Sequence, residues 1–289
     1  MTDSALTRPA AMPKLGFGLT NNPRRVLIWT LLALGGIIMI MPFVFMISTS
    51  LKTQNQIYDL RLIPVAPTIK NYIYLFENTL FVKWFLNSLI VSTLTTLSVL
   101  FFDSLIGYVL CKYQFRGRWF VFIAILSTLM IPTEMLVIPW YLMCVTFGWL
   151  DSYWSIMFPG LMTGFGVFLM KQFFESVPDD LIAAARIDGL SEFRIFWEIA
   201  LPLVMPALSA LAIFAFLGNW TAFLWPLIVT SDPSLYTIPV GLASFAGEFT
   251  TRWEMIMTGA AVATLPTLVV FILFQKFIVR GVMLSGLKG

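Results

Sequence analysis

Long apolar blocks separated by short polar connections make up most of the chain. Six blocks reach the length of a helix that crosses a bilayer, about 20 residues, and they run at about 26–48, 84–111, 119–145, 153–174, 199–230 and 255–279. The first block is too long for the apolar part of a signal peptide, about 7–15 residues. The pattern predicts an all-α integral membrane protein with six transmembrane helices within 26–289, preceded by a polar segment at 1–25.

Proline positions predict that two of these spans are kinked or partly broken. The third block contains Pro132 and Pro139, and the fifth contains Pro202, Pro206 and Pro226. Proline removes a backbone donor and clashes with the preceding turn of a helix. Neighbouring helices can satisfy the freed backbone groups inside a membrane, so such breaks are compatible with spans.

Lysine and arginine are unevenly distributed between alternate connections. Of the 18 basic residues, 13 fall on one side, together with both termini and the connection at 176–198, and five fall on the other. The positive-inside rule places the first set in the cytoplasm. The segment 50–83, which contains several prolines and aromatic residues, is then expected to be a small folded loop outside the cytoplasm.

Composition fits a membrane protein and excludes several kinds of chemistry. Charged residues make up 11% of the chain, against about 25% in soluble domains. The chain has no histidine, which excludes His-based metal sites, proton relays and Ser-His-Asp catalysis. Cys111 and Cys144 fit no disulfide framework and are expected to be free thiols. No G-x-x-x-x-G-K-[ST] loop is present, and the net charge of +3 indicates no nucleic-acid surface.

The connection at 176–198 differs from the blocks around it. Asp179 and Asp180 suit the first turn of a helix, whose positive end favours acidic residues. Three alanines follow, which are strong helix formers of little bulk, and Gly189 is a suitable left-handed terminator. Ser191 is a suitable cap for a second helix. The segment is predicted to be a helix–turn–helix elbow on the cytoplasmic face.

Two interpretations of this elbow remain open on the residues alone. It is either an interfacial helix that only connects the fourth and fifth spans, or a docking element. In the second interpretation its alanine face enters a narrow cleft in a partner, and Arg186 and Asp188 supply charges at the edge. The bend at Gly189 then transmits a movement of the docked helix to the kinked fifth span.

A resemblance to a known family favours docking. The stretch VPDDLIAAARIDG at 177–189, followed by Leu201-Pro202, is similar to the EAA loop of ABC importer membrane subunits. The wider chain resembles carbohydrate importer permeases of the MalG type, through motifs that follow in the correct order. These motifs are SLK at 50–52, NY at 71–72, NSLIVS at 87–92, IPWY at 138–141, FLMKQFF at 168–174, FLWPLIV at 223–229 and RGVMLSGLKG at 280–289.

The resemblance implies a function and a set of partners. The chain would be a permease subunit, without catalytic activity, of a binding-protein-dependent importer of a sugar or oligosaccharide in a bacterial inner membrane. Implied partners are a second, MalF-like permease, a cytoplasmic ATPase dimer that holds the ATP and Mg, an extracytoplasmic solute-binding protein, carbohydrate and lipid. The chain itself is expected to bind no cofactor, metal or nucleic acid.

The resemblance also implies which residues make the ATPase contact. In the coupling loop, at about 176–198, they are Asp180, Ala183, Ala184, Ala185, Arg186, Asp188, Gly189 and Phe193. In the tail at 280–289, they are Gly286, Lys288 and Gly289. Ala183 departs from the family, which has there the Glu that gives the loop its name, so the acidic contact needs a substitute.

Polar and aromatic residues within the spans are candidates for a translocation path. A carboxylate in hydrocarbon costs a few kcal/mol, so Asp103 and Glu134 are expected to face protein or water. For Asp103 a structural position is favoured, near a span end or against the Ser/Thr-rich 92–98; for Glu134 the two interpretations are balanced. Asn219 is a candidate because the polar pattern that follows Trp220 in the family is absent here. The candidate path residues are Glu134, Trp140, Asn219, Trp220 and Asp103.

Other function classes fit less well. An ion-coupled secondary transporter needs an inverted repeat or paired ionisable residues at mid-membrane depth, and an intramembrane enzyme needs clustered catalytic groups. The sequence shows none of these. An ABC importer permease for a solute other than a sugar remains the alternative.

Overall fold

The computed structural model describes residues 23–247 and 250–285, with side chains up to residue 275. It divides into two compact units, residues 1–44 and 45–289. The described part of the first unit belongs to helix α1 (Pro23–Ser50), which continues into the second unit. The large apolar side chains along α1 are mostly exposed, as expected for a helix that lies in lipid.

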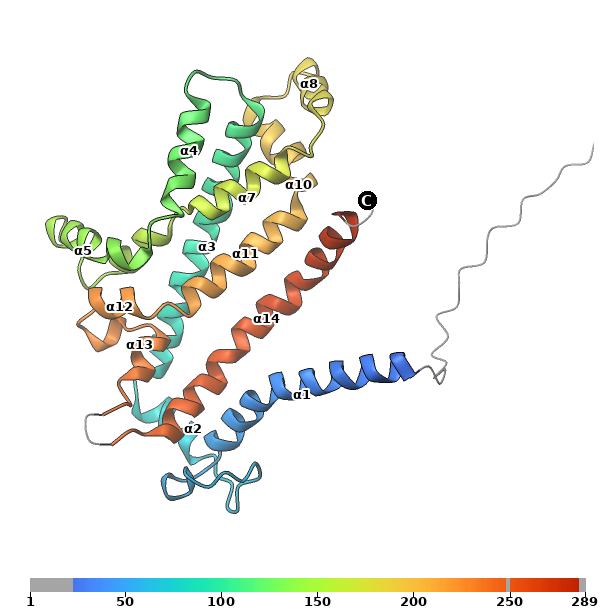
Figure 1. The fold of residues 1–289 in the computed structure, drawn as a ribbon. Helices are drawn as coiled ribbons and strands as arrows, with labels where there is room; N and C mark the ends of the chain where they lie inside the picture. The colour runs from blue at the N-terminus through green and yellow to red at the C-terminus, as the bar shows by residue number, and fades with distance from the viewer. Residues whose placement is uncertain (1–22, 248–249, 286–289) are drawn as a thin grey trace, which may run out of the picture. The chain divides into compact units, whose positions relative to one another are not determined.

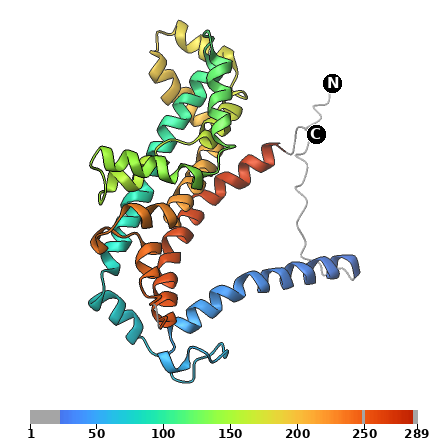
Figure 2. The ribbon, with the colours of Figure 1, turned by 60° about the vertical axis from the view of Figure 1, so that its left-hand side comes forward.

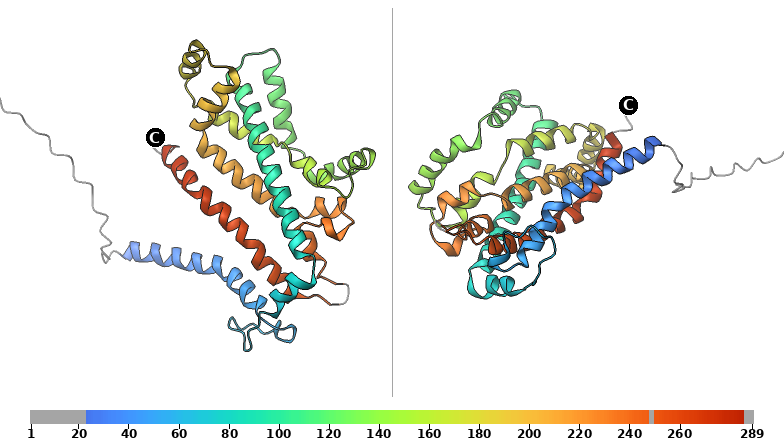
Figure 3. Two further views of the ribbon diagram at one scale, coloured as in Figure 1. Left: turned by 180° about the vertical axis from the view of Figure 1, so that it is seen from behind. Right: turned by 60° about the horizontal axis from the view of Figure 1, so that its bottom comes forward.

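Helix α3 (Phe81–Lys112) is the longest fully described element of the second unit and runs without a break (Figure 1). Helices α7 (Gly164–Phe174) and α11 (Met205–Trp220) pack along it, and α14 (Trp253–Ser285) packs on α11 (Figure 3). The crossing of α3 and α7 is close because Gly107 has no side chain. A Cβ atom there would lie 2.8 Å from the backbone nitrogen of Lys171.

Three further helix pairs are bent at short breaks. The pairs are Arg118–Thr128 with Thr133–Thr146 at 96°, Tyr153–Gly160 with Gly164–Phe174 at 44°, and Glu192–Leu203 with Met205–Trp220 at 86°. By length and composition, the described residues include three helices that can cross a membrane, or up to six if each bent pair is one span. Bends beside Pro132 and between Pro202 and Pro206 confirm the predicted kinks. The bend in the fourth block was not predicted.

These pairs are built from short elements. The first contains α4 (Arg118–Thr128), η2 (Thr133–Leu136) and α5 (Val137–Thr146), and the second contains α6 (Tyr153–Met157), η3 (Phe158–Gly160) and α7. The third contains α9 (Glu192–Arg194), the π-helical η4 (Ile195–Ala200), α10 (Leu201–Leu203) and α11. After α11 the chain leaves helical geometry, so the predicted block 199–230 is interrupted again before α12 (Leu224–Val229).

The first half of α3 holds the connection between α12 and α13 (Ile238–Ala243), which includes η5 (Pro233–Leu235). The indole Nε1 of Trp84 donates to the carbonyl of Pro233 at 2.8 Å. The amide of Asn87 donates to the carbonyls of Ser234 and Tyr236, both at 2.9 Å. These bonds satisfy backbone groups that form no regular ladder, and they fix the connection to α3.

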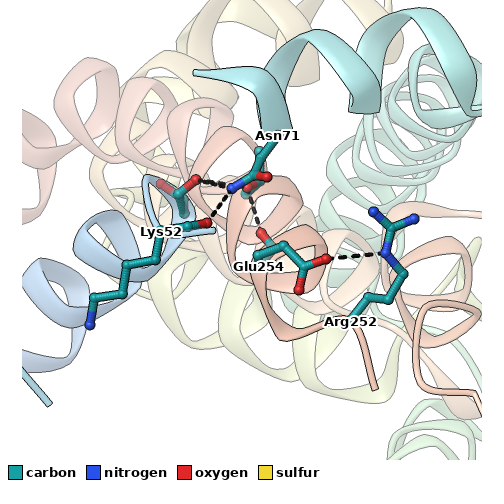
Figure 4. A network of polar contacts seen from close by, with 6 residues as sticks. Lys52, Asn71, Arg252 and Glu254 are labelled. Carbon is teal, nitrogen blue, oxygen red and sulfur yellow. Dashed lines mark hydrogen bonds and ion pairs between the residues drawn. The ribbon is translucent and has the colours of Figure 1, made fainter. Parts of the chain in front are cut away.

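A polar junction joins the end of α1, α2 (Lys70–Asn78) and the start of α14 (Figure 4). The side-chain amide of Asn71 donates to the carbonyls of Ser50 and Lys52, both at 2.8 Å. The hydroxyl of Thr258 also donates to the Ser50 carbonyl, at 3.3 Å. Because α1 ends at Ser50, these donors satisfy carbonyls near its end, where a helix leaves several without a partner of its own. The junction brings the SLK and NY motifs together.

The charged residues of the junction are paired locally. Arg252 donates to Glu254 at 3.1 Å, and its guanidinium lies 4.8 Å from the centroid of the Tyr74 ring. The ammonium of Lys52, which is buried, donates to the carbonyl of Asp59 at 2.6 Å. Another short 3₁₀ element, η1 (Gln54–Gln56), lies in the loop between these two residues.

Asn71→Asp tests the junction. The change replaces a hydrogen-bond donor by a carboxylate that faces two carbonyl oxygens, so we expect the free energy of unfolding to fall by about 1–3 kcal/mol. Thermal unfolding of the detergent-solubilised protein measures this as a lower midpoint. Asn78→Asp is the control, because Asn78 is exposed on the same helix. Equal midpoints for the two variants would contradict the role of Asn71.

Candidate functional site

The connection at 176–198 contains a helix and a sharp bend. Helix α8 (Asp179–Ile187) is followed by Gly189, whose φ of +81° lies in the left-handed region. The N–H of Leu190 donates to the Ala185 carbonyl and the N–H of Gly189 donates to the Arg186 carbonyl, both at 3.1 Å. This pair of bonds closes the helix in the Schellman arrangement that favours glycine at this position.

One face of α8 packs against the protein itself. Ile182 and Ala185 are 3% and 4% exposed and belong to a core cluster that includes Tyr108 and Phe196. We expected Ala185 and its neighbours to form a surface for a partner, but the methyl group of Ala185 faces this core. The exposed face instead carries Ala183 and Ala184, together with Asp180, Leu181, Ile187, Asp188 and Gly189.

The start of α8 is anchored to the last residue of α3. The ammonium of Lys112 donates to the Val177 carbonyl and to the Asp179 carboxylate, both at 2.6 Å. The Lys112 side chain is 6% exposed, whereas that of Asp179 is 86% exposed. The hydrogen bond from Lys112 lowers the pKa of Asp179, because a donor from a cation favours the ionised carboxylate. Figure 2 shows α8 and this end of α3 at the same end of the unit.

The end of α8 is anchored to the residue that follows α3. Arg186 donates to both carboxylate oxygens of Glu192, with Nε–Oε1 2.7 Å and Nη2–Oε2 3.2 Å. The hydroxyl of Tyr113 donates to Oε2 of the same carboxylate, and the Arg186 guanidinium lies 5.6 Å from the Tyr113 ring centroid. Sequence reasoning missed Tyr113 and Glu192 because the two residues are 79 positions apart and follow no helical spacing.

Pairing within the loop leaves its exposed charge acidic. Arg186 is paired with Glu192, and Arg194 is paired with Glu198 at 2.9 Å within one helical turn. The side chain of Asp188 is exposed and makes no hydrogen bond or ion pair with any described residue, and the same holds for the side chain of Asp180. Arg186 therefore differs from the expectation of a charge offered to a partner, whereas Asp188 remains available.

The second arm of the elbow presents aromatic surface. Phe193 and Trp197 are 55% and 52% exposed and stack with ring centroids 6.4 Å apart. Phe196 between them is buried. Ser191 occupies the cap position before α9, but its side chain makes no capping hydrogen bond. Gly286, Lys288 and Gly289 of the tail lie outside the described residues.

Asp103 is a structural residue in this conformation. It is fully buried and accepts from the Thr163 hydroxyl at 2.7 Å and from the Thr163 N–H at 3.1 Å. Thr163 in turn accepts from the N–H of Gly166 and caps α7. From the sequence, we expected water or the Ser/Thr-rich segment 92–98 to be the partner of Asp103. The partner is instead the break in the fourth block, where free N–H groups begin α7.

The other candidate path residues do not gather at one site. Trp220 is 4% exposed and donates to the Ala263 carbonyl at 3.0 Å, so it belongs to the core. Asn219 donates to the Ala215 carbonyl. Trp140 packs edge-on against Trp225 with centroids 5.7 Å apart, and Glu134 is exposed in η2. Among the described residues, no group of three or more His, Cys, Asp or Glu could hold a metal ion.

Comparisons with known proteins agree on one family. The family model described as "Binding-protein-dependent transport system inner membrane component" matches residues 103–284. The arabinooligosaccharides transport system permease protein AraQ of Bacillus subtilis is 35% identical over 86% of this chain and 90% of its own length. The trehalose/maltose transport system permease protein MalG of Thermococcus litoralis is 31% identical over 92% of this chain and 98% of its own.

A solved structure has the same fold. A bacterial ABC transporter involved in the import of the acidic polysaccharide alginate aligns with a TM-score of 0.78. The alignment covers 89% of this chain and 96% of that chain at 22% sequence identity. The two backbones are therefore alike over nearly their whole length, although most of the residues differ.

Gly166→Ala tests the link between Asp103 and α7. A Cβ atom at Gly166 would collide with the Asp103 carboxylate and lie 2.9 Å from the Thr163 hydroxyl, so we expect a destabilisation of about 1–3 kcal/mol. Gly218→Ala adds the same methyl group in α11, where nothing lies within 4 Å. Thermal unfolding in detergent should show a lower midpoint for the first variant alone. An equal midpoint in both would contradict the close packing.

Proposed function

Because the chain belongs to the family of inner membrane components of binding-protein-dependent transport systems, we propose that it is the permease subunit of an ATP-driven importer of oligosaccharides. The observation that carries the proposal is the exposed face of α8, held at the end of α3 and ended by the bend at Gly189. An apolar, small-residue face with acidic edges suits a narrow cleft with a basic rim in an ATPase subunit.

The chain would act together with other subunits. A second permease would supply the other half of the translocation pathway, and two ATPase subunits would hold ATP and Mg. A solute-binding protein would deliver the saccharide outside the cytoplasm. Closure of the ATPases would displace α8 and change the exposure of the pathway from one side of the membrane to the other, which is alternating access driven by differential binding.

The proposed orientation has support from neighbouring contacts. Lys112, placed in the cytoplasm by the distribution of basic residues, contacts Asp179 at the start of the coupling loop. Lys52 and Arg252, placed on the opposite side, belong to the polar junction of α1, α2 and α14 (Figure 4). Lys70, placed on the same side, is the first residue of α2. Both termini are then cytoplasmic.

The substrate class follows from the names of similar proteins. AraQ of Bacillus subtilis and MalG of Thermococcus litoralis are named for arabinooligosaccharides and for trehalose and maltose. A second candidate class is polar non-sugar solutes, because UgpE of Yersinia pestis, named for sn-glycerol-3-phosphate transport, is 34% identical over 71% of this chain.

Substrate stimulation separates these classes. The purified complex with its binding protein is given arabino- and malto-oligosaccharides, trehalose or sn-glycerol-3-phosphate, and ATP hydrolysis is measured. We expect an oligosaccharide to stimulate hydrolysis, because a loaded binding protein favours the conformation in which the ATPases close. Stimulation by the phosphate ester alone would favour the second class, and stimulation by none would contradict the assignment to both.

Gly189→Val tests the docking surface. Forcing a β-branched residue into the left-handed region costs about 1–2 kcal/mol, and its side chain would project from the exposed bend. We expect roughly tenfold less ATPase to co-purify with the tagged chain, because this side chain would obstruct a docked partner; tenfold corresponds to about 1.4 kcal/mol. Gly117→Val is the control, because Gly117 has a φ of +89° and open space but lies in the connection between α3 and α4. Equal losses in the two variants would show that strain, not docking, is responsible.

A further inference from the structure

Two adjacent residues at the end of α3 hold opposite ends of α8. Lys112 bonds the start of α8 through Val177 and Asp179. Tyr113 reaches the other end through Glu192, which is bonded by Arg186 in the last turn of α8. Between these anchors α8 buries two side chains in the core cluster. The helix is therefore anchored to the end of α3 at both of its own ends, while its middle packs on the core cluster.

We propose that Glu192 is a positioning residue whose carboxylate closes a clamp, formed by Tyr113, Arg186 and Glu192, that makes α8 move with α3. The inference rests on the proposed function, because α8 is taken as the element that the ATPase displaces. It adds the route by which that displacement enters the membrane. The clamp also assigns a role to the loop's own acidic residue in a chain that has Ala183 where the family has Glu.

The geometry of Glu192 suits this role. Its two oxygens accept from three donors on two other elements, and Arg186 is bound through two nitrogens. Isolated exposed ion pairs contribute little to stability. A carboxylate that binds a bidentate arginine and a third donor, however, restricts the orientation of the bonded groups as well as the distance between them. The clamp crosses the bend at Gly189, so it limits the freedom that the glycine would otherwise give the elbow.

A second route leads from α8 into α11, because α8 also packs on η4. It passes through α9, the π-helical η4 and α10, and then through the 86° bend at Val204. By contrast, α3 runs unbroken from Phe81 to Lys112. Its first half is bonded through Trp84 and Asn87 to the connection at 233–236. A displacement delivered to α3 therefore reaches the opposite end of the unit along one helix.

The charge states that the clamp needs persist around neutral pH. The hydrogen bonds from Arg186 and then Tyr113 lower the pKa of Glu192. Burial, and then the bond to Glu192, raises the pKa of Tyr113. Because the pKa of the Glu192 carboxylate is lowered, the contribution of the clamp to stability is present at pH values above the ordinary pKa of Glu. It is lost as pH falls through the pKa that Glu192 has in the folded protein. The clamp is thus a constant constraint at physiological pH.

Glu192→Gln keeps the shape of the side chain and removes its charge, and Glu198→Gln is the matched control. Glu198 is paired with Arg194 in the same loop, but both residues lie on one helical stretch. In the assembled transporter in proteoliposomes, we expect Glu192→Gln to lower the amount of substrate transported per ATP hydrolysed by about three- to fivefold. This factor corresponds to the free energy that a small network of exposed ion pairs contributes. Glu198→Gln should leave this ratio unchanged.

Hydrogen exchange on the isolated chain in detergent gives a second readout that needs no partner. Amides of 179–189 should exchange faster in Glu192→Gln than in Glu198→Gln, because local opening of α8 becomes easier. Tyr113→Phe, which removes only the hydroxyl, should act in the same direction. The double variant of Tyr113 and Glu192 should be no worse than Glu192→Gln, because both changes open one clamp.

The outcomes are distinct. Unchanged exchange and an unchanged transport ratio in Glu192→Gln, in a complex that itself transports, would overturn the inference. Additive effects of the Tyr113 and Glu192 variants would also overturn it. A wild-type complex without ATP-driven transport would instead contradict the proposed function, while the exchange data would still decide whether Glu192 holds α8 in place.

Discussion

A helix that ends or breaks where the protein or the bilayer excludes water leaves backbone N–H and C=O groups that need another partner. This constraint explains two polar contacts that join distant parts of the sequence. Asp103 and Thr163 meet where α7 begins after a break. Asn71 and Thr258 meet at the carbonyl that ends α1. In each case a side chain from a distant part of the sequence supplies the missing partner and joins two elements.

The same contacts make α3 the reference element of the second unit. It carries Asp103 in its second half, Asn87 in its first half, and Lys112 at its end. Through these residues it holds the start of α7, the connection at 233–236 and the start of α8. The neighbouring spans are bent or interrupted. One unbroken helix can therefore carry a displacement from the coupling loop to all of these elements together, which is what a conformational cycle needs.

Periodicity and proline positions predicted much of the fold. Apolar length predicted the long helices α1, α3 and α14, and Pro132, Pro202 and Pro206 predicted two of the bends, because proline acts locally on its own helix. The bend at Gly189 was predictable for the same reason, since a left-handed terminator depends on one residue. The burial of Ala185 was not, because alanine fits both a core and a surface, and only the neighbouring Tyr108 and Phe196 decide which.

Polar partners were the least predictable part of the site, for a physical reason. A buried carboxylate must be satisfied, but sequence does not say by which residue, and Asp103 uses Thr163, 60 positions away, in place of the hydroxyls nearby. The same reasoning applies to the coupling loop. Arg186 is the kind of charged residue that suits contact with a partner. Within the chain, however, its guanidinium donates to Glu192 and lies near the ring of Tyr113. A charged residue beside a bend is as well suited to hold the bend as to meet a partner, and the partner's surface must then match the charges that remain, those of Asp180 and Asp188.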